Sequence, residues 1–272
     1  MAFLTEPEPA RNVLIPVAPG IARIVATNPG PMTYHGTNTY VIEGEDGATV
    51  LDPGPDDHAH VQAILRATGG RVARILLSHT HRDHLGALPA LRVATGAPAC
   101  GFRHSQEPGF TADIMLDDGD AVGDWMALHT PGHAADHLCF ARDDGVILTA
   151  DHVMTWSTSV VSPPAGDMGA YFTQLRRLLA RDDRLLLPGH GPPLADPCRY
   201  LRFLLAHREQ REAAVLAAIA AEPHTPAALV DIIYAAVNPR LRAAAERNVL
   251  AHLLKLQDEG RAQTQDQSWR AA

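Results

Sequence analysis

The sequence has few cysteines, no long apolar run and no excess of positive charge, and each of these absences narrows the possible functions. Its three cysteines, Cys100, Cys139 and Cys198, are widely spaced and form no Cys-x-x-Cys pair. Neither a disulfide framework nor a thiolate zinc site is therefore predicted. Because disulfides are typical of secreted proteins, a reducing, intracellular setting is expected.

Nothing in the sequence predicts secretion or a membrane. Residues 1–9 lack the basic and apolar segments of a signal peptide, and no apolar run approaches the roughly 18 residues that a membrane helix needs. We therefore expect a cytoplasmic protein with no membrane partner. The formal net charge of −8 argues against an extended nucleic-acid surface, without excluding a local basic patch.

The chain of 272 residues, 46% of them hydrophobic, is long enough to bury a large core. Its character changes at Pro197: short strand-like runs alternate with helical segments before it, and Ala-, Leu- and Arg-rich helical sequence follows. We predict two domains, residues 1–196 and residues 197–272. An Ala/Leu-rich tail is compatible with a homodimer.

Strands and helices alternate in the middle of the first domain. A strand at 48–51 precedes a helix at 58–68, a strand at 74–77, a helix at 85–95 and a strand at 97–102. This order predicts a layered α/β fold. A polar connection is expected at 103–120, with a β-turn at its Asp-rich end. The remaining predicted elements are strands at 13–17, 21–26, 39–43, 121–129, 138–141, 146–149 and 185–187 and a helix at 168–181.

One hexapeptide, His79-Thr80-His81-Arg82-Asp83-His84, follows the apolar run 75–78. It places three histidines and a carboxylate at the end of a predicted strand, where α/β sheets bind their ligands. Imidazoles and carboxylates are the usual ligands of zinc and related divalent metals. Four such groups so close together crowd one tetrahedral ion but can be shared between two neighbouring ions.

Similar residues recur at three further strand ends: His133 in a Pro-Gly turn, Asp151 after 146–149, and His190 after 185–187. Four strands that each end in a ligand-type residue predict a metal site. Asp52, which follows the strand at 48–51, is predicted either to form a turn or to orient a metal-bound histidine. We expect structural or solvated roles for the remaining histidines of this region, His104, His129 and His137.

Two segments lie outside this pattern. The loop 153–167 either lines a substrate pocket or packs without touching substrate. Helices at 199–221, 226–237 and 239–258, followed by a hairpin within 261–269, resemble a winged helix. The third helix carries both signs of charge, so a structural or dimerising role is favoured over DNA binding.

The motifs HTHRDH at 79–84, TPGH at 130–133 and PGHG at 188–191, with the strand-end aspartate between the last two, resemble the metallo-β-lactamase superfamily over residues 13–195. Further motifs look like its β-lactamase-like protein 2 group, which carries a C-terminal winged-helix-like domain. They are GTNTY at 36–40, TPGHAADH at 130–137, LPGHGP at 187–192 and HREQRE at 207–212. The resemblance implies an αββα sandwich with a dinuclear metal site at one edge.

The resemblance also implies the ligands of two divalent ions, for which we expect zinc, with iron and manganese as alternatives. His79, His81 and His133 would hold the first ion, and Asp83, His84 and His190 the second. Asp151 would bridge the two, and Asp52 would support the site. The chain departs from many members in having Ala150 before Asp151 and His152 after it, which we expect to alter the pocket rather than the site.

These features predict a hydrolase that uses a metal-bridged hydroxide, with Asp83 as ligand and proton acceptor. The negative net charge of the chain favours a small ester or thioester over RNA as the substrate. The family likeness keeps single-stranded RNA as an alternative, cleaved by an endoribonuclease, and a β-lactam or lactone as a second. The least favoured alternative is a non-enzymatic interaction module whose fold is stabilised by a metal ion, because a structural site does not need seven ligands.

Overall fold

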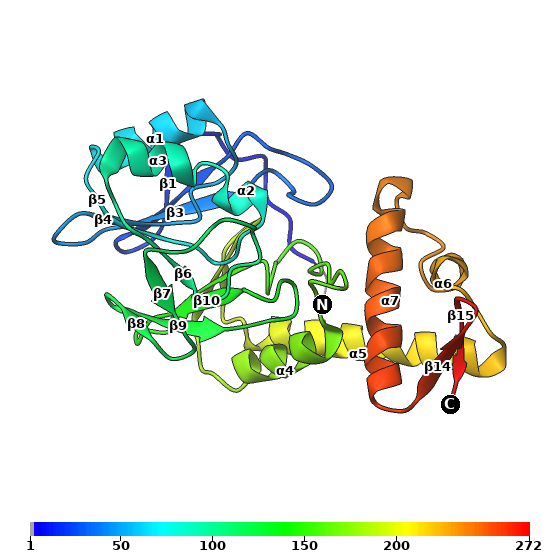
Figure 1. The fold of residues 1–272 in the computed structure, drawn as a ribbon. Helices are drawn as coiled ribbons and strands as arrows, with labels where there is room; N and C mark the ends of the chain where they lie inside the picture. The colour runs from blue at the N-terminus through cyan, green and yellow to red at the C-terminus, as the bar shows by residue number, and fades with distance from the viewer. Residues whose placement is uncertain (1–2) are drawn as a thin grey trace.

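Two β-sheets pack face to face, and helices cover their outer faces (Figure 1). The computed structural model describes residues 3–272. The first sheet has the strand order β1-β2-β3-β4-β5-β6-β7 and the second the order β13-β12-β11-β10-β9-β8. The strands of the first sheet are β1 (Leu14–Ala18), β2 (Ile21–Val25), β3 (Asn38–Ile42), β4 (Ala48–Leu51), β5 (Val72–Leu76), β6 (Ala99–Phe102) and β7 (Ile114–Leu116). Those of the second are β8 (Ala121–Val122), β9 (Trp125–His129), β10 (Leu138–Ala141), β11 (Val146–Ala150), β12 (Leu185–Pro188) and β13 (Leu194–Ala195).

Helices connect the parallel strands of each sheet except β6 and β7, which an irregular segment joins. In the first sheet, β4 to β7 are parallel neighbours, and parallel neighbours require a crossover connection. The crossovers are α1 (His58–Thr68) and the pair α2 (Arg82–Leu85) and α3 (Leu88–Thr95). In the second sheet, α4 (Met168–Leu179) connects the parallel strands β11 and β12. The loops that follow the carboxyl ends of four strands therefore meet at one edge of the sandwich. These strands are β4 and β5 of the first sheet and β11 and β12 of the second.

Three apolar layers hold the sandwich together. Between the sheets, Tyr40, Leu51 and Leu76 of the first pack with Phe140 and Leu148 of the second. The other two layers lie between each sheet and its own helices. With α1 and α3 on one outer face and α4 and α5 (Cys198–Ala221) on the other (Figure 1), the architecture is the predicted αββα sandwich.

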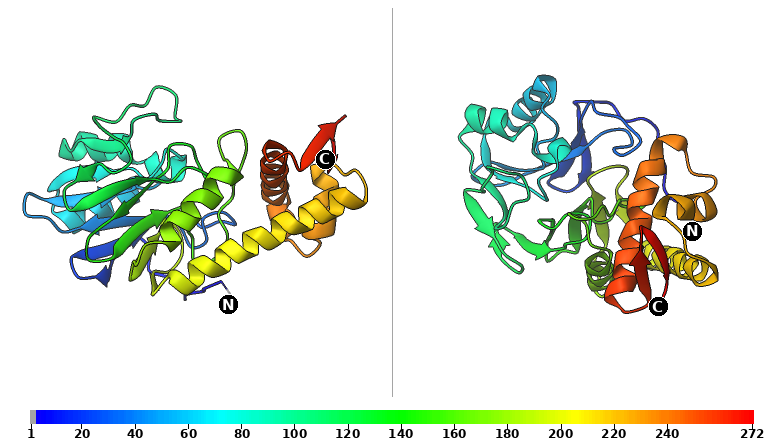
Figure 2. Two further views of the ribbon diagram at one scale, coloured as in Figure 1. Left: turned by 90° about the horizontal axis from the view of Figure 1, so that it is seen from below. Right: turned by 45° about the vertical axis from the view of Figure 1, so that its right-hand side comes forward.

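The helix α5 extends from the sandwich to the C-terminal elements (Figure 2). Tyr200 and Leu204 of its first half pack on the outer layer of the second sheet, whereas Val215 and Ile219 belong to a separate C-terminal core. That core is built on α6 (Pro226–Ile233), the 3-10 turn η1 (Pro239–Leu241), α7 (Arg242–Asp258) and the hairpin of β14 (Ala262–Gln265) and β15 (Ser268–Ala271). Helices followed by a hairpin confirm the winged-helix prediction. The predicted division after residue 196 stays a prediction.

The structure corrects three predicted elements. The helix predicted at 85–95 begins three residues later, as α3, and Leu85 instead ends the separate short helix α2. Between them, a Cβ at Gly86 would lie 2.6 Å from the backbone nitrogen of Asp56. The strand predicted at 121–129 is a hairpin of β8 and β9, turned at Gly123 with a φ of 60°. The connection 103–120 contains β7, whose three residues are too few to show a pattern.

Within residues 3–272, no helix combines the length and the apolar composition that crossing a membrane requires.

Candidate metal centre

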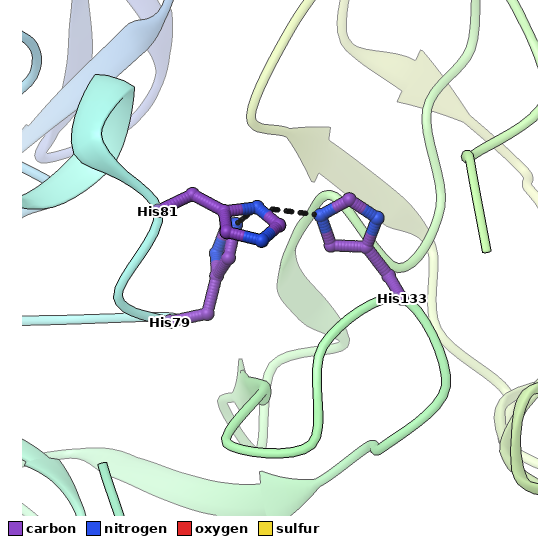
Figure 3. A group of neighbouring side chains, drawn as sticks. All are labelled: His79, His81 and His133. Carbon is purple, nitrogen blue, oxygen red and sulfur yellow. Dashed lines mark hydrogen bonds between the residues drawn. The ribbon is translucent and has the colours of Figure 1, made fainter. Parts of the chain in front are cut away.

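The seven predicted metal ligands come together at one edge of the sandwich, on the loops that follow β5, β9, β11 and β12. His79 and His81 lie on one loop and face His133 on another (Figure 3). The ring atoms His79 Nε2 and His133 Nε2 each lie 3.0 Å from His81 Nδ1. Three imidazole nitrogens therefore converge on one point.

A second group forms beside the first. His84 Nε2 and His190 Nε2 lie 3.5 Å and 3.3 Å, respectively, from Asp83 Oδ2. Asp83 and His84 lie on the short helix α2, which follows β5, and His190 lies just after the end of β12. The arrangement gives two nitrogens and one oxygen that converge, like the three nitrogens of the first group.

Asp151 lies between the two groups and faces both. Its Oδ1 is 3.5 Å from His84 Nε2 and 3.4 Å from His190 Nε2. Its Oδ2 is 3.7 Å from His133 Nε2. One carboxylate thus directs one oxygen to each group, which is the arrangement that a ligand shared by two ions needs.

Buried atoms without partners show that this cluster fits a divalent metal. His84 Nε2, His190 Nε2 and Asp151 Oδ1 are buried and have no hydrogen-bond partner among the described residues. A buried polar atom without a partner is costly and rare, and a cation at this position would satisfy all three. The donors are nitrogen and oxygen only, a set that suits zinc, iron and manganese.

Asp52 and Ser78 orient the rings of His79 and His84 through the Nδ1 atoms, which face away from the cluster. Asp52 Oδ2 accepts a hydrogen bond from the Ser78 hydroxyl (2.7 Å) and lies 2.9 Å from His84 Nδ1. The Ser78 hydroxyl oxygen is in turn 2.9 Å from His79 Nδ1. With Nδ1 engaged in this way, each ring turns its Nε2 toward the cluster. Of the two roles that the sequence allowed for Asp52, the structure shows the supporting one.

Backbone carbonyls orient two other rings. His133 Nδ1 donates to the carbonyl of Val160 at 2.7 Å, and His190 Nδ1 to that of Gly36 at 3.3 Å. Sequence reasoning missed both partners because a carbonyl belongs to every residue. The structure requires glycine at position 36, because its φ is 138° and a Cβ there would clash with the carbonyl oxygen of Ala26.

The two groups differ in charge when no metal is bound. Burial opposes protonation of His84 and His190, but the adjacent carboxylates outweigh it and raise both pKa values, that of His190 to about 9. Burial and neighbouring histidines instead lower the pKa of His79, and they lower that of His81 to about 4. At neutral pH the imidazoles of His79 and His81 are therefore neutral, whereas those of His84 and His190 form ion pairs with the adjacent carboxylates.

The histidines expected to be structural lie outside the cluster. His104 is exposed, and the His129 ring stacks on Phe102 with centroids 4.0 Å apart. His137 is buried, with Nδ1 2.8 Å from the Thr130 hydroxyl. His152, which we expected to alter the pocket, is also buried, and neither of its ring nitrogens has a hydrogen-bond partner among the described residues.

A cavity of about 460 Å³ opens onto the cluster. Its lining includes His81, Asp83, His133 and Asp151. The loop 153–167 and the N-terminal part of α7 supply most of the remaining wall. The loop therefore lines a pocket at the site, the first of the two roles that the sequence left open.

Comparisons with known proteins agree with the site and the fold. Residues 32–190 match the model of the metallo-beta-lactamase superfamily, and residues 225–269 match that of the beta-lactamase associated winged helix domain. Because the first match covers more than half of the chain, the chain belongs to the metallo-beta-lactamase superfamily.

Three relatives illustrate the similarity. The Beta-lactamase-like protein 2 homolog of Drosophila melanogaster is 28% identical over 267 residues, covering 89% of each chain. The Atrochrysone carboxyl ACP thioesterase of Aspergillus terreus is 29% identical, over 78% of this chain and 67% of that protein. The crystal structure of a beta-lactamase domain protein from Burkholderia ambifaria superimposes with a TM-score of 0.84 at 23% identity, over 97% of this chain and 95% of that one. At that identity the last comparison shows the fold alone.

Proposed function

We propose that the chain is a dinuclear metal-dependent hydrolase that cleaves acyl thioesters or small esters. The single observation that carries this proposal is the position of Asp151, which directs one oxygen to each of two converging ligand groups. The unpartnered buried atoms beside it support a cation on the side of His84 and His190.

Each predicted ligand has a place in this proposal. His79, His81 and His133 would hold one ion, whereas Asp83, His84 and His190 would hold the other, with Asp151 shared. Zinc is our first choice of metal, with iron and manganese as alternatives. When bound, two such ions supply a water nucleophile at neutral pH and a Lewis acid for the carbonyl oxygen.

Asp83 has a second role that Asp151 cannot share. The Asp83 side chain is 30% exposed and lines the cavity, whereas that of Asp151 is 9% exposed. Despite burial, the imidazoles of His84 and His190 lower the pKa of Asp83 below its usual range, so its carboxylate stays ionised at neutral pH. The ionised Asp83 carboxylate is therefore placed to accept a hydrogen bond from the attacking water and so to orient it.

The pocket and the relatives both support an acyl substrate. Apolar side chains, among them Met32, Met154 and Val160, line the cavity, and Arg247 is the one permanent cation among the described residues of its lining. RNA recognition relies on several phosphate contacts and on aromatic stacking, which this lining does not offer. The Aspergillus terreus relative is named as an atrochrysone carboxyl ACP thioesterase.

A substrate panel tests the proposal. Metal-loaded protein is offered an acyl thioester, a β-lactam and a single-stranded RNA, and product formation is measured for each. We expect thiol release from the thioester, with His84→Ala and Asp83→Ala inactive yet folded by circular dichroism, and His104→Ala active as an exposed-histidine control. Cleavage of RNA alone, or full thioester activity in metal-loaded His84→Ala, would overturn the proposal.

A further inference from the structure

We propose that the C-terminal domain completes the substrate site. An apolar channel between α7 and the loop 153–167 holds the acyl chain, and Arg247 contacts the carboxylate of the carboxylic acid that hydrolysis releases. This inference rests on the proposed function, because it takes the metal centre as the place of hydrolysis. It identifies the substrate class as acyl groups with an unbranched apolar chain, and it assigns a specificity-determining residue to a domain outside the metal cluster.

Two neighbouring cavities form the channel. The cavity at the metal ligands adjoins a second one of about 160 Å³, and four residues line both: Met32, Met154, Val160 and Ala244. The second cavity then runs along the C-terminal domain, past Trp156, Tyr234, Val237 and Leu241. We call these eight residues the acyl channel.

The walls of the acyl channel suit a flexible hydrocarbon chain. Apolar side chains dominate its lining, and two of them are methionines, whose unbranched side chains adapt to irregular shapes. The Trp156 ring, stacked on Tyr34 at 4.9 Å and 18°, gives one wall a rigid face. Each methylene moved from water into such a lining should tighten binding about three- to fourfold.

Buried polar contacts fix the two walls relative to each other. Asn248 of α7 accepts a hydrogen bond from the backbone N–H of Val161 at 3.0 Å. Arg208 of α5, only 1% exposed, donates to the carbonyl of Ser159 and to Asn248 Oδ1. The loop and the C-terminal domain are therefore joined at the channel, and its shape is a property of the folded chain.

Arg247 lies at the metal end of the channel, in the same cavity as Asp83 and Asp151. One of its nitrogens, Nη1, donates to the carbonyl of Pro163 at 3.0 Å. No carboxylate of residues 3–272 lies within 4.0 Å of its guanidinium. An exposed guanidinium held by one hydrogen bond keeps donors free for an oxyanion, which Arg binds in a fork geometry.

Calorimetry with straight-chain carboxylic acids tests the channel. Zinc-loaded protein is titrated with acids from four to ten carbons, so that the head group is constant and only the chain varies. We expect Kd to fall about threefold per added methylene until the channel is full. Ala244→Trp should block the passage between the two cavities and abolish this trend while butyrate still binds. Ala213→Trp, on the exposed face of α5, is the matched control and should keep the trend.

A second comparison tests Arg247. Hexanoic acid and hexanamide differ only in the charged head group, and their Kd ratio is measured in Arg247→Gln, in the wild type and in Arg247→Lys. We expect Arg247→Gln to reduce the preference for the acid about tenfold, with partial retention in Arg247→Lys. Arg240→Gln, an exposed arginine outside both cavities, should leave the ratio unchanged.

The outcomes separate this inference from the proposed function. A Kd that does not change with chain length in the wild type, or a trend that survives Ala244→Trp, would overturn the channel. An unchanged acid preference in Arg247→Gln would overturn the role of Arg247. If the chain-length trend appears but no thioester is hydrolysed by the same zinc-loaded protein, the proposed function fails and the channel stands.

Discussion

Asp52 shows how one residue behind the cluster can control several residues in it. Its carboxylate contacts His84 directly and reaches His79 through the Ser78 hydroxyl. It is 1% exposed and its φ is 50°, a conformation that non-glycine residues rarely adopt. Backbone strain at a site is tolerated where the surroundings enforce it, here by hydrogen bonds on both carboxylate oxygens.

We predict that Asp52→Ala weakens zinc binding about 10- to 100-fold, because the rings of His79 and His84 lose the contacts that orient them. Competition with a chromogenic chelator measures the affinity. Asp57→Ala serves as the control: Asp57 caps α1 from a half-buried position, so its loss should cost about 1 kcal/mol of stability and leave zinc affinity unchanged. Equal zinc affinities for Asp52→Ala and the wild type would contradict the role of Asp52.

The raised pKa values of His84 and His190 predict that zinc binding releases protons. In the metal-free protein the pKa of His190 is about 9 and that of His84 is also raised, so both rings are protonated at pH 7.5 and must lose a proton to bind metal. Calorimetric titration with zinc in buffers of different ionisation enthalpy measures this release. A binding enthalpy that is the same in all buffers would contradict it.

The same shifts set a pH dependence of stability without metal. A histidine whose pKa is raised on folding stabilises the fold fully below its unfolded pKa of about 6.5. That contribution is lost as the pH rises toward about 9, the pKa of folded His190. The melting temperature of metal-free protein should therefore fall between these pH values, and bound zinc should reduce the fall.

The sequence allows prediction of residues that carry ligand atoms, but not of all their partners. Four ligands were predictable because they lie close together in the sequence after one predicted strand: His79, His81, Asp83 and His84. The carbonyls of Val160 and Gly36, which orient His133 and His190, left no such pattern. A backbone acceptor is present at every position, so only the folded chain shows which one is used.

At the scale of elements, the loop 153–167 depends on the C-terminal domain for its position. Asn248 of α7 accepts hydrogen bonds from Val161 and Arg208, and both contacts are buried. The Arg208 guanidinium also lies 5.1 Å from the centre of the Tyr171 ring. With Arg247, which donates to the carbonyl of Pro163, Asn248 thus ties α7 to a loop that lies about 90 residues earlier in the sequence.

We predict that Asn248→Leu destabilises the protein by about 1–3 kcal/mol, because it leaves the buried N–H of Val161 without an acceptor. It should also increase proteolysis within 153–167, which limited trypsin or chymotrypsin digestion measures. Asn248→Asp keeps the acceptor oxygen and faces Arg208, so it should retain most of the stability. Equal stability for Asn248→Leu and the wild type would contradict this role of the contact.

The first and last residues of strands and helices were predictable where clear turn residues flank the element. Three elements have the bounds that the sequence predicted: the strands at 48–51 and 138–141 and the helix at 58–68. The helix ends at Gly69, whose φ is 58°. The prediction failed where a turn was too short to recognise, as at Gly123, or where a strand had only three residues, as in β7. Short elements depend on pairing with distant strands more than on their own residues.

At the scale of the whole molecule, the two sheets bring together four loops that are up to about 110 residues apart in sequence. The αββα architecture was predictable because the motifs resemble those of a known family. The placement of α7 against the pocket was not, because it depends on packing between α5, α7 and the loop 153–167. The C-terminal domain therefore contributes to the pocket as well as to the fold.

The central claim is that hydrolysis requires two metal ions held by this cluster. Metal-free protein is titrated with zinc, and thiol release from an octanoyl thioester is measured together with the zinc bound per chain. The account predicts no thiol release without zinc and a rate that rises until two zinc ions are bound per chain. Thiol release by metal-free protein, or none with two zinc ions bound, would contradict it.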